Sequence, residues 1–400
     1  MRWLLAIVAL FSLAPAARAA EPVRIGFDGE FGVVGSMSAQ AIERGIAMAI
    51  AEINEAGGVL GGRKLELVVR DNRSVPARSR ENLRDLAGER DLVAVFCGRF
   101  SPVVLENLDV VHQLGLLLLD PWATADGIVD NGYQPNPVFR LSLRDQWVLP
   151  AMLRHAAAKG AARVGVLAPN TGWGRSGLAA IESAGGPGLP KVVGTSWYNW
   201  GDKSLARPYV DLLRQGAQAI LFIANDAEGA VLLREVAAMP RQERLPLVMH
   251  WGVTAGSLAK NAGGALGELD LSVVQSFSFL NADQRRVARF LDRWQKLFGP
   301  VRPEAIAAPV GVAHAYDLTH ILARAVNLAG TTDRAQVRAA LERVRDYDGL
   351  VRRYAQPFSP TNHEALTADQ VFMAAFRSDG AVIPLPTPRG RGDGGGREAR

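Results

Sequence analysis

Segments typical of buried β-strands alternate with amphipathic helical segments along the first 124 residues of the chain. The alternating segments run strand first through 23–29, 39–58, 64–72, 75–89, 91–98, 101–115 and 116–124. The helical segments carry apolar residues at three- and four-residue spacing, which is typical of a helix packed on one face. Strands that alternate with helices in this way pair in parallel, because a helical crossover returns the chain to the same edge of the sheet.

The same alternation starts again after residues 136–147. Strand and helix patterns follow at 149–160, 163–170, 174–185, 191–198, 205–216, 219–226, 229–239 and 246–252. A chain of 400 residues is longer than the ~250–300 residues at which single cores stop growing. We therefore predict an α/β fold with two doubly wound parallel-sheet lobes, followed by further amphipathic helices in the last third of the chain.

The two ends of the chain differ from the rest in composition. Residues 1–20 contain an early arginine, an apolar stretch and small residues around Ala17 and Ala19, which is the pattern of a cleaved secretory signal peptide. No cysteine stands near the cleavage region to take a lipid anchor, so we expect a protein that works in a compartment such as a bacterial periplasm. Residues 389–400 are rich in glycine and arginine and hold no apolar residue larger than alanine, so we predict a disordered tail.

Charge, cysteine content and motifs exclude several classes of function. The net charge of +5 is scattered along the chain, which argues against nucleic acid as a partner. The single cysteine, Cys97, allows no internal disulfide and is predicted to be a buried core residue. Neither a phosphate-binding glycine loop nor a nucleophile elbow is present, and the histidines show no metal-ligand spacing. We expect no enzyme activity, no cofactor and no metal.

Five motifs in a fixed order resemble one family. They are AIAEINEAGGVLGGRKLELVVRDN, VFCGRFSPVVL, DPWAT, AHAYDLTHILARA and RAQVRAALERVRDYDG. Over residues 23–386 the chain resembles the type I periplasmic solute-binding proteins of the branched-chain amino acid and amide class, which deliver ligands to ABC importers. The resemblance implies two lobes joined by three crossovers, with residues 21–143 and 279–345 in the N-terminal lobe and 144–278 and 346–388 in the C-terminal lobe.

The resemblance also implies a ligand between the lobes, and it assigns first-lobe residues to it. Ser101 falls where the family places a serine hydroxyl on a ligand carboxylate. Thr124 would donate its hydroxyl and backbone amide to the same group, the backbone of Trp122 would add another contact, and Ala123 lies in the same loop. Two other interpretations stay open: Ser101 is a favoured residue for capping a helix, and Trp122 could be core packing.

On the second lobe, Trp173 falls where the family places an aromatic that closes over the ligand. The loops after two later strands supply Asn225 and Asp226, and then His250 and Trp251. Relatives that bind amino acids offer a glutamate to the ligand ammonium in the second of these loops, and none stands here.

Two ligand classes therefore remain open. Either Asp226 is the counter-charge of an ammonium group, or the ligand lacks an ammonium and is a carboxylate, an amide or a small aromatic acid held between tryptophans. As structural alternatives, Asp226 could interact with the helix that it begins, and His250 could be a hydrogen-bonded structural histidine.

Two functions fit this pattern. The first is a monomeric binding protein that delivers a small solute to the permease of an ABC importer in the inner membrane. The second is a soluble sensor subunit that presents the same ligand to a membrane signalling receptor. Both need only a surface that forms when the lobes close.

Overall fold

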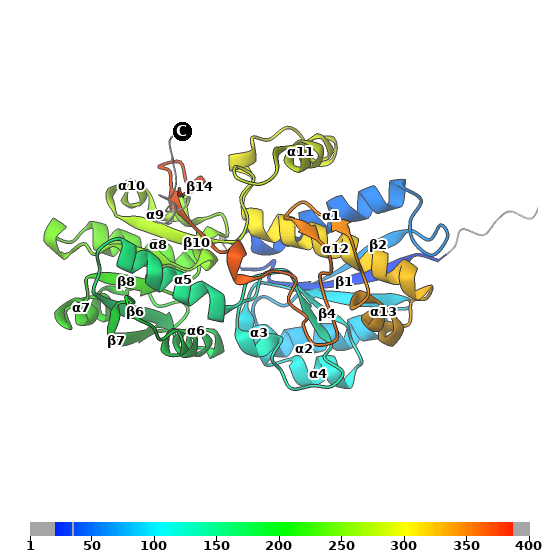
Figure 1. Ribbon diagram of the computed structural model, residues 1–400, viewed down its shortest axis with the longest axis horizontal. Helices are drawn as coiled ribbons and strands as arrows, with labels where there is room; N and C mark the ends of the chain where they lie inside the picture. The colour runs from blue at the N-terminus through cyan, green and yellow to red at the C-terminus, as the bar shows by residue number, and fades with distance from the viewer. Residues whose placement is uncertain (1–20, 34–35, 387–400) are drawn as a thin grey trace, which may run out of the picture.

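Two lobes lie side by side in the computed structural model, which describes residues 21–33 and 36–386 (Figure 1). The predicted signal peptide 1–20 and the predicted tail 389–400 lie outside the described residues. Within the described residues, no helix has the length and apolar character needed to cross a membrane.

The first lobe is built on a parallel five-stranded sheet in the order β2-β1-β3-β4-β5. Its strands are β1 (Val23–Gly29), β2 (Leu65–Asp71), β3 (Leu92–Cys97), β4 (Leu118–Asp120) and β5 (Val138–Arg140). Successive residues of β3 enter different cores: Phe96 packs in one hydrophobic cluster, and Val95 and Cys97 in another. A strand buried on both faces explains why these runs are continuously apolar.

Helices cover both faces of this sheet (Figure 1). On one side lie α1 (Ser38–Glu55), α12 (Pro309–Ala329) and α13 (Arg334–Leu341), and on the other lie α2 (Pro76–Ala87), α3 (Ser101–Leu105) and α4 (Leu108–Gln113). The predicted doubly wound architecture is confirmed, and α12 and α13 reach this lobe from a distant part of the sequence.

The second lobe is built on a seven-stranded sheet in the order β14-β13-β10-β9-β8-β6-β7. Its parallel strands are β6 (Arg163–Pro169), β7 (Lys191–Tyr198), β8 (Ala219–Phe222), β9 (Leu247–Met249) and β10 (Leu271–Gln275). The antiparallel strands β13 (Phe372–Phe376) and β14 (Val382–Pro384) complete one edge. Its helices are α5 (Asp145–Ala158), α6 (Gly172–Ser183), α7 (Ala206–Arg214), α8 (Asp226–Ala237), α9 (Leu258–Ala262) and α10 (Ala265–Glu268).

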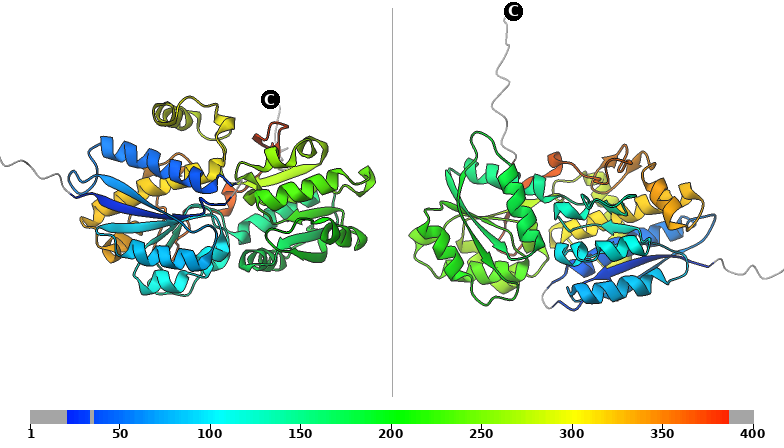
Figure 2. Two further views of the ribbon diagram at one scale, coloured as in Figure 1. Left: turned by 180° about the vertical axis from the view of Figure 1, so that it is seen from behind. Right: turned by 90° about the horizontal axis from the view of Figure 1, so that it is seen from below.

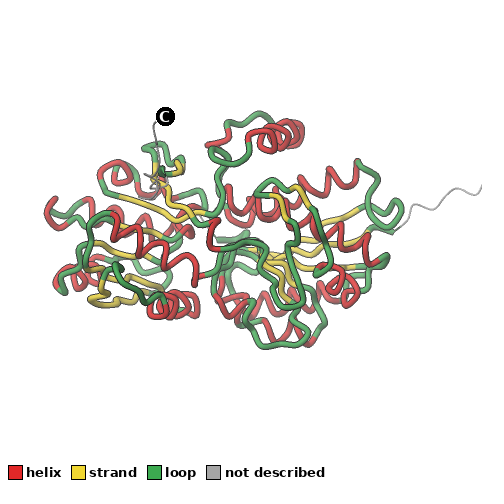
Figure 3. Tube along the Cα trace, viewed as in Figure 1, coloured by secondary structure: helices red, strands yellow, loops and turns green. Residues whose placement is uncertain are grey.

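The chain passes between the lobes three times. The first passage links β5 to α5, the second leads from β10 to α12, and the third runs from the first lobe to β13. The second passage includes α11 (Gln284–Phe298), which stands apart from both sheets in two views (Figures 1 and 2). The linking segments are largely loops (Figure 3), as expected for parts that bend when two lobes move.

The third passage lies later in the chain than the predicted boundary after residue 345. A small hairpin of β11 (Tyr347–Asp348) and β12 (Arg353–Tyr354) is anchored to Asp317 of α12. The Asp317 carboxylate accepts hydrogen bonds from the backbone amide of Leu350 at 2.6 Å and from the hydroxyl of Tyr354 at 3.0 Å. We therefore propose a revised division in which residues 346–366 stay with the N-terminal lobe.

Candidate ligand-binding site

The carboxyl ends of the parallel strands of both sheets face each other across a small cavity. Open α/β sheets bind ligands outside the carboxyl ends of their strands. Of the predicted site residues, all but Ala123 and Asp226 line this cavity, together with Arg99, Phe100 and Gly252. The predicted residues that line it are Ser101, Trp122, Thr124, Trp173, Asn225, His250 and Trp251.

The loop after β4 is held in shape by hydrogen bonds from buried side chains. The Asp120 carboxylate accepts the backbone amides of Trp122 at 2.9 Å and Ala123 at 2.7 Å. The Ser142 hydroxyl donates to the carbonyl of Trp122 at 3.0 Å. The backbone amide and carbonyl of Trp122 are therefore engaged inside the protein, and the expectation that this backbone contacts the ligand finds no support here.

Ser101 takes part in the same loop and not in a helix cap. The helix α3 begins at Ser101 itself, and Phe100 occupies the cap position. The Ser101 Oγ accepts the backbone amides of Thr124 at 3.2 Å and Ala125 at 3.3 Å. The Thr124 amide thus has a partner within the protein, while the proton of the Ser101 hydroxyl remains available to an acceptor in the cavity.

Trp122 is both packed and in contact with the cavity. Its side chain is 2% exposed, and its ring lies against Gly311 of α12, where an added Cβ would stand 2.4 Å from Cζ3. The absence of a side chain at position 311 makes room for the ring. The indole therefore forms a fixed wall of the cavity.

The second-lobe wall is built around His250. The Nδ1 of His250 accepts the backbone amide of Gly252 at 3.2 Å, so a neutral ring carries its proton on Nε2. The ring packs edge-to-face against Trp173 at 4.9 Å and Trp251 at 5.7 Å between centroids. His250 is thus a hydrogen-bonded structural histidine that also lines the cavity.

Asp226 does not line the cavity and is paired with Arg99 from the opposite lobe. The Arg99 Nη2 donates to the Asp226 Oδ1 at 2.9 Å, and the two side chains are 3% and 2% exposed. Ser257 donates its hydroxyl to the other oxygen of the same carboxylate. In this closed arrangement the predicted counter-charge for a ligand ammonium is already occupied.

The sequence of the chain matches the family described as "Periplasmic binding protein" over residues 22–381. The chain belongs to the periplasmic binding protein family. Its lobes have the type I fold, and the family consists of substrate-binding proteins of ABC transporters and not of enzymes.

Relatives of this periplasmic binding protein differ in what their names say they bind. The leucine-, isoleucine-, valine-, threonine- and alanine-binding protein of Pseudomonas aeruginosa is 25% identical over 346 residues, covering 84% of this chain and 87% of the relative. A type 1 periplasmic binding protein from Bordetella pertussis shares the fold with a TM-score of 0.82 at 24% identity, covering 92% of this chain and 100% of that one. A solute-binding protein of Rhodopseudomonas palustris, solved with 4-hydroxybenzoate, has a TM-score of 0.76 at 17% identity and covers 92% of this chain and 96% of its own.

Arg99, Phe100 and Gly252 line the site but were not predicted from the sequence, and Arg99 is the charged residue among them. Arg99 stands inside the motif VFCGRFSP, two residues before Ser101, so its position in the strand-end loop was visible. What the motif did not reveal is the burial of its guanidinium group. An arginine in a strand-end loop that precedes a proposed ligand residue was the available signal.

Glu30 lies behind Arg99 in the first lobe. Its carboxylate accepts the backbone amide of Arg99 at 3.3 Å and the hydroxyl of Ser38. Burial raises the pKa of Glu30, and the positive charge of Arg99 acts in the opposite direction.

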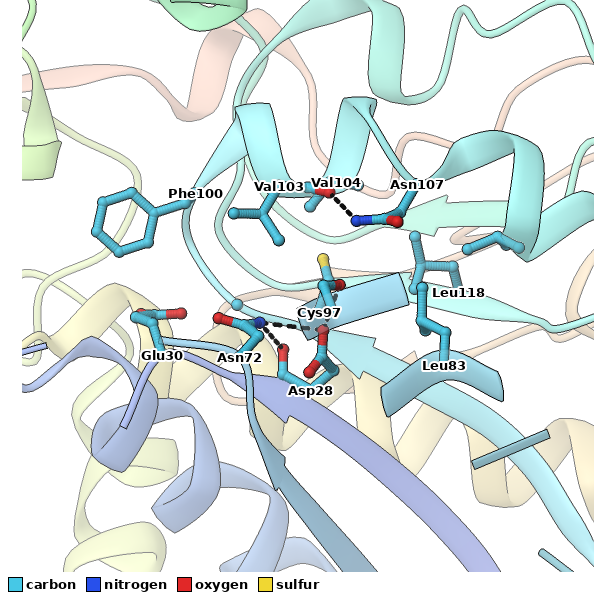
Figure 4. Close-up of a pocket in the computed structure, with 13 residues that line it drawn as sticks. Asp28, Glu30, Asn72, Leu83, Cys97, Phe100, Val103, Val104, Asn107 and Leu118 are labelled. Atoms are coloured by element: carbon cyan, nitrogen blue, oxygen red, sulfur yellow. Dashed lines mark hydrogen bonds between the residues drawn. The ribbon is translucent and has the colours of Figure 1, made fainter. Parts of the chain in front are cut away.

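A second small cavity is lined only by residues of the first lobe (Figure 4). It adjoins Asp28, whose carboxylate accepts hydrogen bonds from Asn72 at 3.0 Å and Ser79 at 2.6 Å. Burial raises the pKa of Asp28 to about 6. Cys97 borders the same space, and burial raises the pKa of its thiol, so the prediction of a buried core cysteine is confirmed. This cavity receives no side chain from the second lobe, which distinguishes it from the inter-lobe site.

Proposed function

We propose that this periplasmic binding protein captures a small carboxylic acid in the inter-lobe cavity and delivers it to the permease of an ABC importer. The observation that carries the proposal is the chemistry of the cavity wall. Three residues that line it each carry a buried side-chain nitrogen without a hydrogen-bond partner among the described residues, namely Arg99 Nε, Trp173 Nε1 and His250 Nε2. The first two can only donate a hydrogen bond, and the third donates when His250 is in the tautomer described above.

A wall with unpartnered donors favours an acceptor as its ligand. Leaving buried donors unpaired costs free energy, and hydrogen bonds from them to a carboxylate are stronger than those to a neutral acceptor. The Ser101 hydroxyl adds a fourth donor on the first lobe. The tryptophan rings of the wall would cover the apolar part of the ligand, since aromatic rings pack well against flat or branched apolar groups.

Delivery follows from closure of the lobes. The ligand would touch both lobes and so stabilise the closed form by the contacts that exist only there. Segments at the lobe junctions would absorb the hinge motion. The closed form would then present a surface that the permease recognises, and opening would release the acid.

A thermal-shift screen of the protein without residues 1–20 tests the proposal. The compounds are small aliphatic and aromatic acids, their amides and the common amino acids. A ligand present at ~100 times its Kd adds about 2.7 kcal/mol to the free energy of unfolding, so an acid should raise the melting temperature while its amide does not.

The Thr124→Val variant keeps the shape of a cavity residue and removes its hydroxyl, and Thr361→Val at an exposed position is the matched control. We expect Thr124→Val to weaken the response to the acid, and Thr361→Val to respond as the wild type does. A screen in which amides or amino acids stabilise the protein and no acid does would contradict the proposal.

A further inference from the structure

We infer that Arg99 determines the specificity of the site by occupying the position that a ligand ammonium group would take beside Asp226. The protein supplies its own cation there, so the site selects acids that lack an α-ammonium group. This inference rests on the proposed function and narrows its ligand class. Arg99 belongs to the first lobe, and the carboxylate on which it acts is that of Asp226 in the second lobe.

The Arg99 guanidinium makes polar contacts with the second lobe through two of its nitrogens. Nη2 donates to the Asp226 carboxylate at 2.9 Å, and Nη1 donates to the carbonyl of Gly252 at 3.2 Å. The remaining nitrogen, Nε, is buried without a partner among the residues that the structure describes. Arg99 therefore neutralises the acid of one lobe and still has a donor left at the cavity.

Arg99 is held in this position by its neighbours on the first lobe. The guanidinium lies over the ring of Phe100 at 4.7 Å, and Glu30 accepts the Arg99 backbone amide. The preceding residue is Gly98, where an added Cβ would stand 1.9 Å from a carboxylate oxygen of Glu30. Because a side chain at position 98 would collide with Glu30, the approach of this acid to Arg99 depends on glycine.

Asp226 has no remaining capacity for a ligand ammonium in this arrangement. One oxygen accepts from Arg99 and the other from Ser257. An ammonium brought to Asp226 would stand beside a second cation, and like charges at short range in a buried site repel strongly. A carboxylate in the same cavity would instead be attracted to the guanidinium.

Asp145 is another buried acid near the site, and its two carboxylate oxygens have no hydrogen-bond partner among the described residues. Its Oδ1 lies 3.7 Å from the Nε2 of His250, and the residue is not among those that line the cavity.

Pairs of ligands that differ only in the ammonium group test this inference. The pairs are L-phenylalanine with 3-phenylpropanoate and L-leucine with 4-methylpentanoate, measured by isothermal titration calorimetry. The wild type should bind the acid of a pair at least tenfold more tightly than the amino acid. The Arg99→Met variant, which removes the charge and keeps a long side chain, should lower this preference at least tenfold because it frees Asp226.

Two further variants distinguish the effect of the Arg99 charge on binding from an effect of the substitution on folding. Arg99→Lys retains a cation and should keep the preference for the acid. Asp226→Asn in the Arg99→Met background should abolish any gain in binding of the amino acid. Circular dichroism and melting temperature establish that each variant is folded, and Asp226→Asn alone gives a second measurement if Arg99→Met does not fold.

The outcomes distinguish this inference from the proposed function. If the wild type prefers the amino acids, or if Asp226→Asn alone selectively abolishes amino acid binding, Asp226 holds a ligand ammonium and the role of Arg99 is wrong. If Arg99→Met weakens both members of a pair equally, Arg99 is not a specificity residue although the site binds acids. If the wild type binds neither these acids nor any other in the thermal screen, the proposed function fails and the inference fails with it.

Discussion

The guanidinium of Arg140 and the carboxylate of Glu364 form a bidentate pair although 224 positions separate them in the sequence. The Nε donates to Oε2 at 2.8 Å and Nη2 donates to Oε1 at 2.5 Å, and the side chains are 0% and 5% exposed. Nη1 of the same group donates to the carbonyls of Ala123 at 3.2 Å and Ala125 at 3.0 Å. One buried arginine thus connects the end of β5, the segment before the third passage and the loop that bears Trp122.

Breaking this pair should destabilise the protein strongly. Glu364→Gln removes the counter-charge and leaves Arg140 buried, which typically costs about 3–5 kcal/mol. Equilibrium unfolding in urea measures the change. The matched control is Asp109→Asn, which breaks the exposed pair with Arg80 and should leave the unfolding midpoint close to that of the wild type. Equal effects of the two substitutions would show that the buried pair contributes no more than a surface pair.

Gly311→Ala should disturb the ligand cavity from outside it. The new Cβ would stand 2.4 Å from the Trp122 ring, so the ring or α12 must shift, at a cost of about 1–3 kcal/mol. Weaker binding of the acid identified in the thermal screen should accompany this loss of stability. Gly267→Ala, where an added Cβ meets no atom within 4 Å, is the control. A Gly311→Ala protein with wild-type affinity and stability would show that the contact is not tight.

His314 should make the protein less stable as the pH falls. Burial lowers the pKa of His314 from 6.5 to about 4. Between these values the unfolded chain binds more protons than the folded one, so stability is lost as the pH falls from 6.5 towards 4. The full shift corresponds to roughly 3 kcal/mol.

Unfolding of wild type and His314→Gln across this pH range isolates the contribution of the histidine. The comparison is needed because burial raises the pKa of Asp28 to about 6 and of Asp120 to about 7. The folded protein therefore binds protons at these two acids more tightly than the unfolded chain does, and their contribution to stability falls as the pH rises. His112→Gln, at an exposed position, is the control. Parallel pH profiles for wild type and His314→Gln would contradict the prediction.

Ligand binding should change the tryptophan fluorescence through the cavity wall. Trp122, Trp173 and Trp251 line the cavity, whereas Trp197 is 39% exposed and lies outside it. Trp173→Phe should reduce the ligand-dependent change and weaken binding about tenfold, which is about 1.4 kcal/mol. Trp197→Phe should preserve both. A ligand-dependent signal that disappears only in Trp197→Phe would place the binding event elsewhere.

Local pattern was sufficient to predict the fold class, and the family resemblance supplied most of the cavity wall. Most strands of the two sheets were visible, because a strand covered on both faces must be continuously apolar, but β5 and β10 were not predicted. The assignment of Ser101, Trp122, Trp173 and His250 came from the family resemblance, and it agrees with the rule that ligands bind outside the carboxyl ends of parallel strands. The antiparallel strands β13 and β14 were not predicted, because their pairing depends on which edge of the sheet the returning chain reaches.

What only the tertiary structure decided is which polar groups are already paired. The sequence places Asp226 at the start of a helix and Arg99 in another strand-end loop, but their ion pair forms only when the two lobes meet. In the same way, the amides of Trp122 and Thr124 are engaged by Asp120 and Ser101. Hydrogen bonds and ion pairs depend on distances between residues far apart in the chain, whereas apolar periodicity is a local property. The sequence alone therefore determined the architecture and the place of the site, and the tertiary contacts decided which donors and charges remain for a ligand.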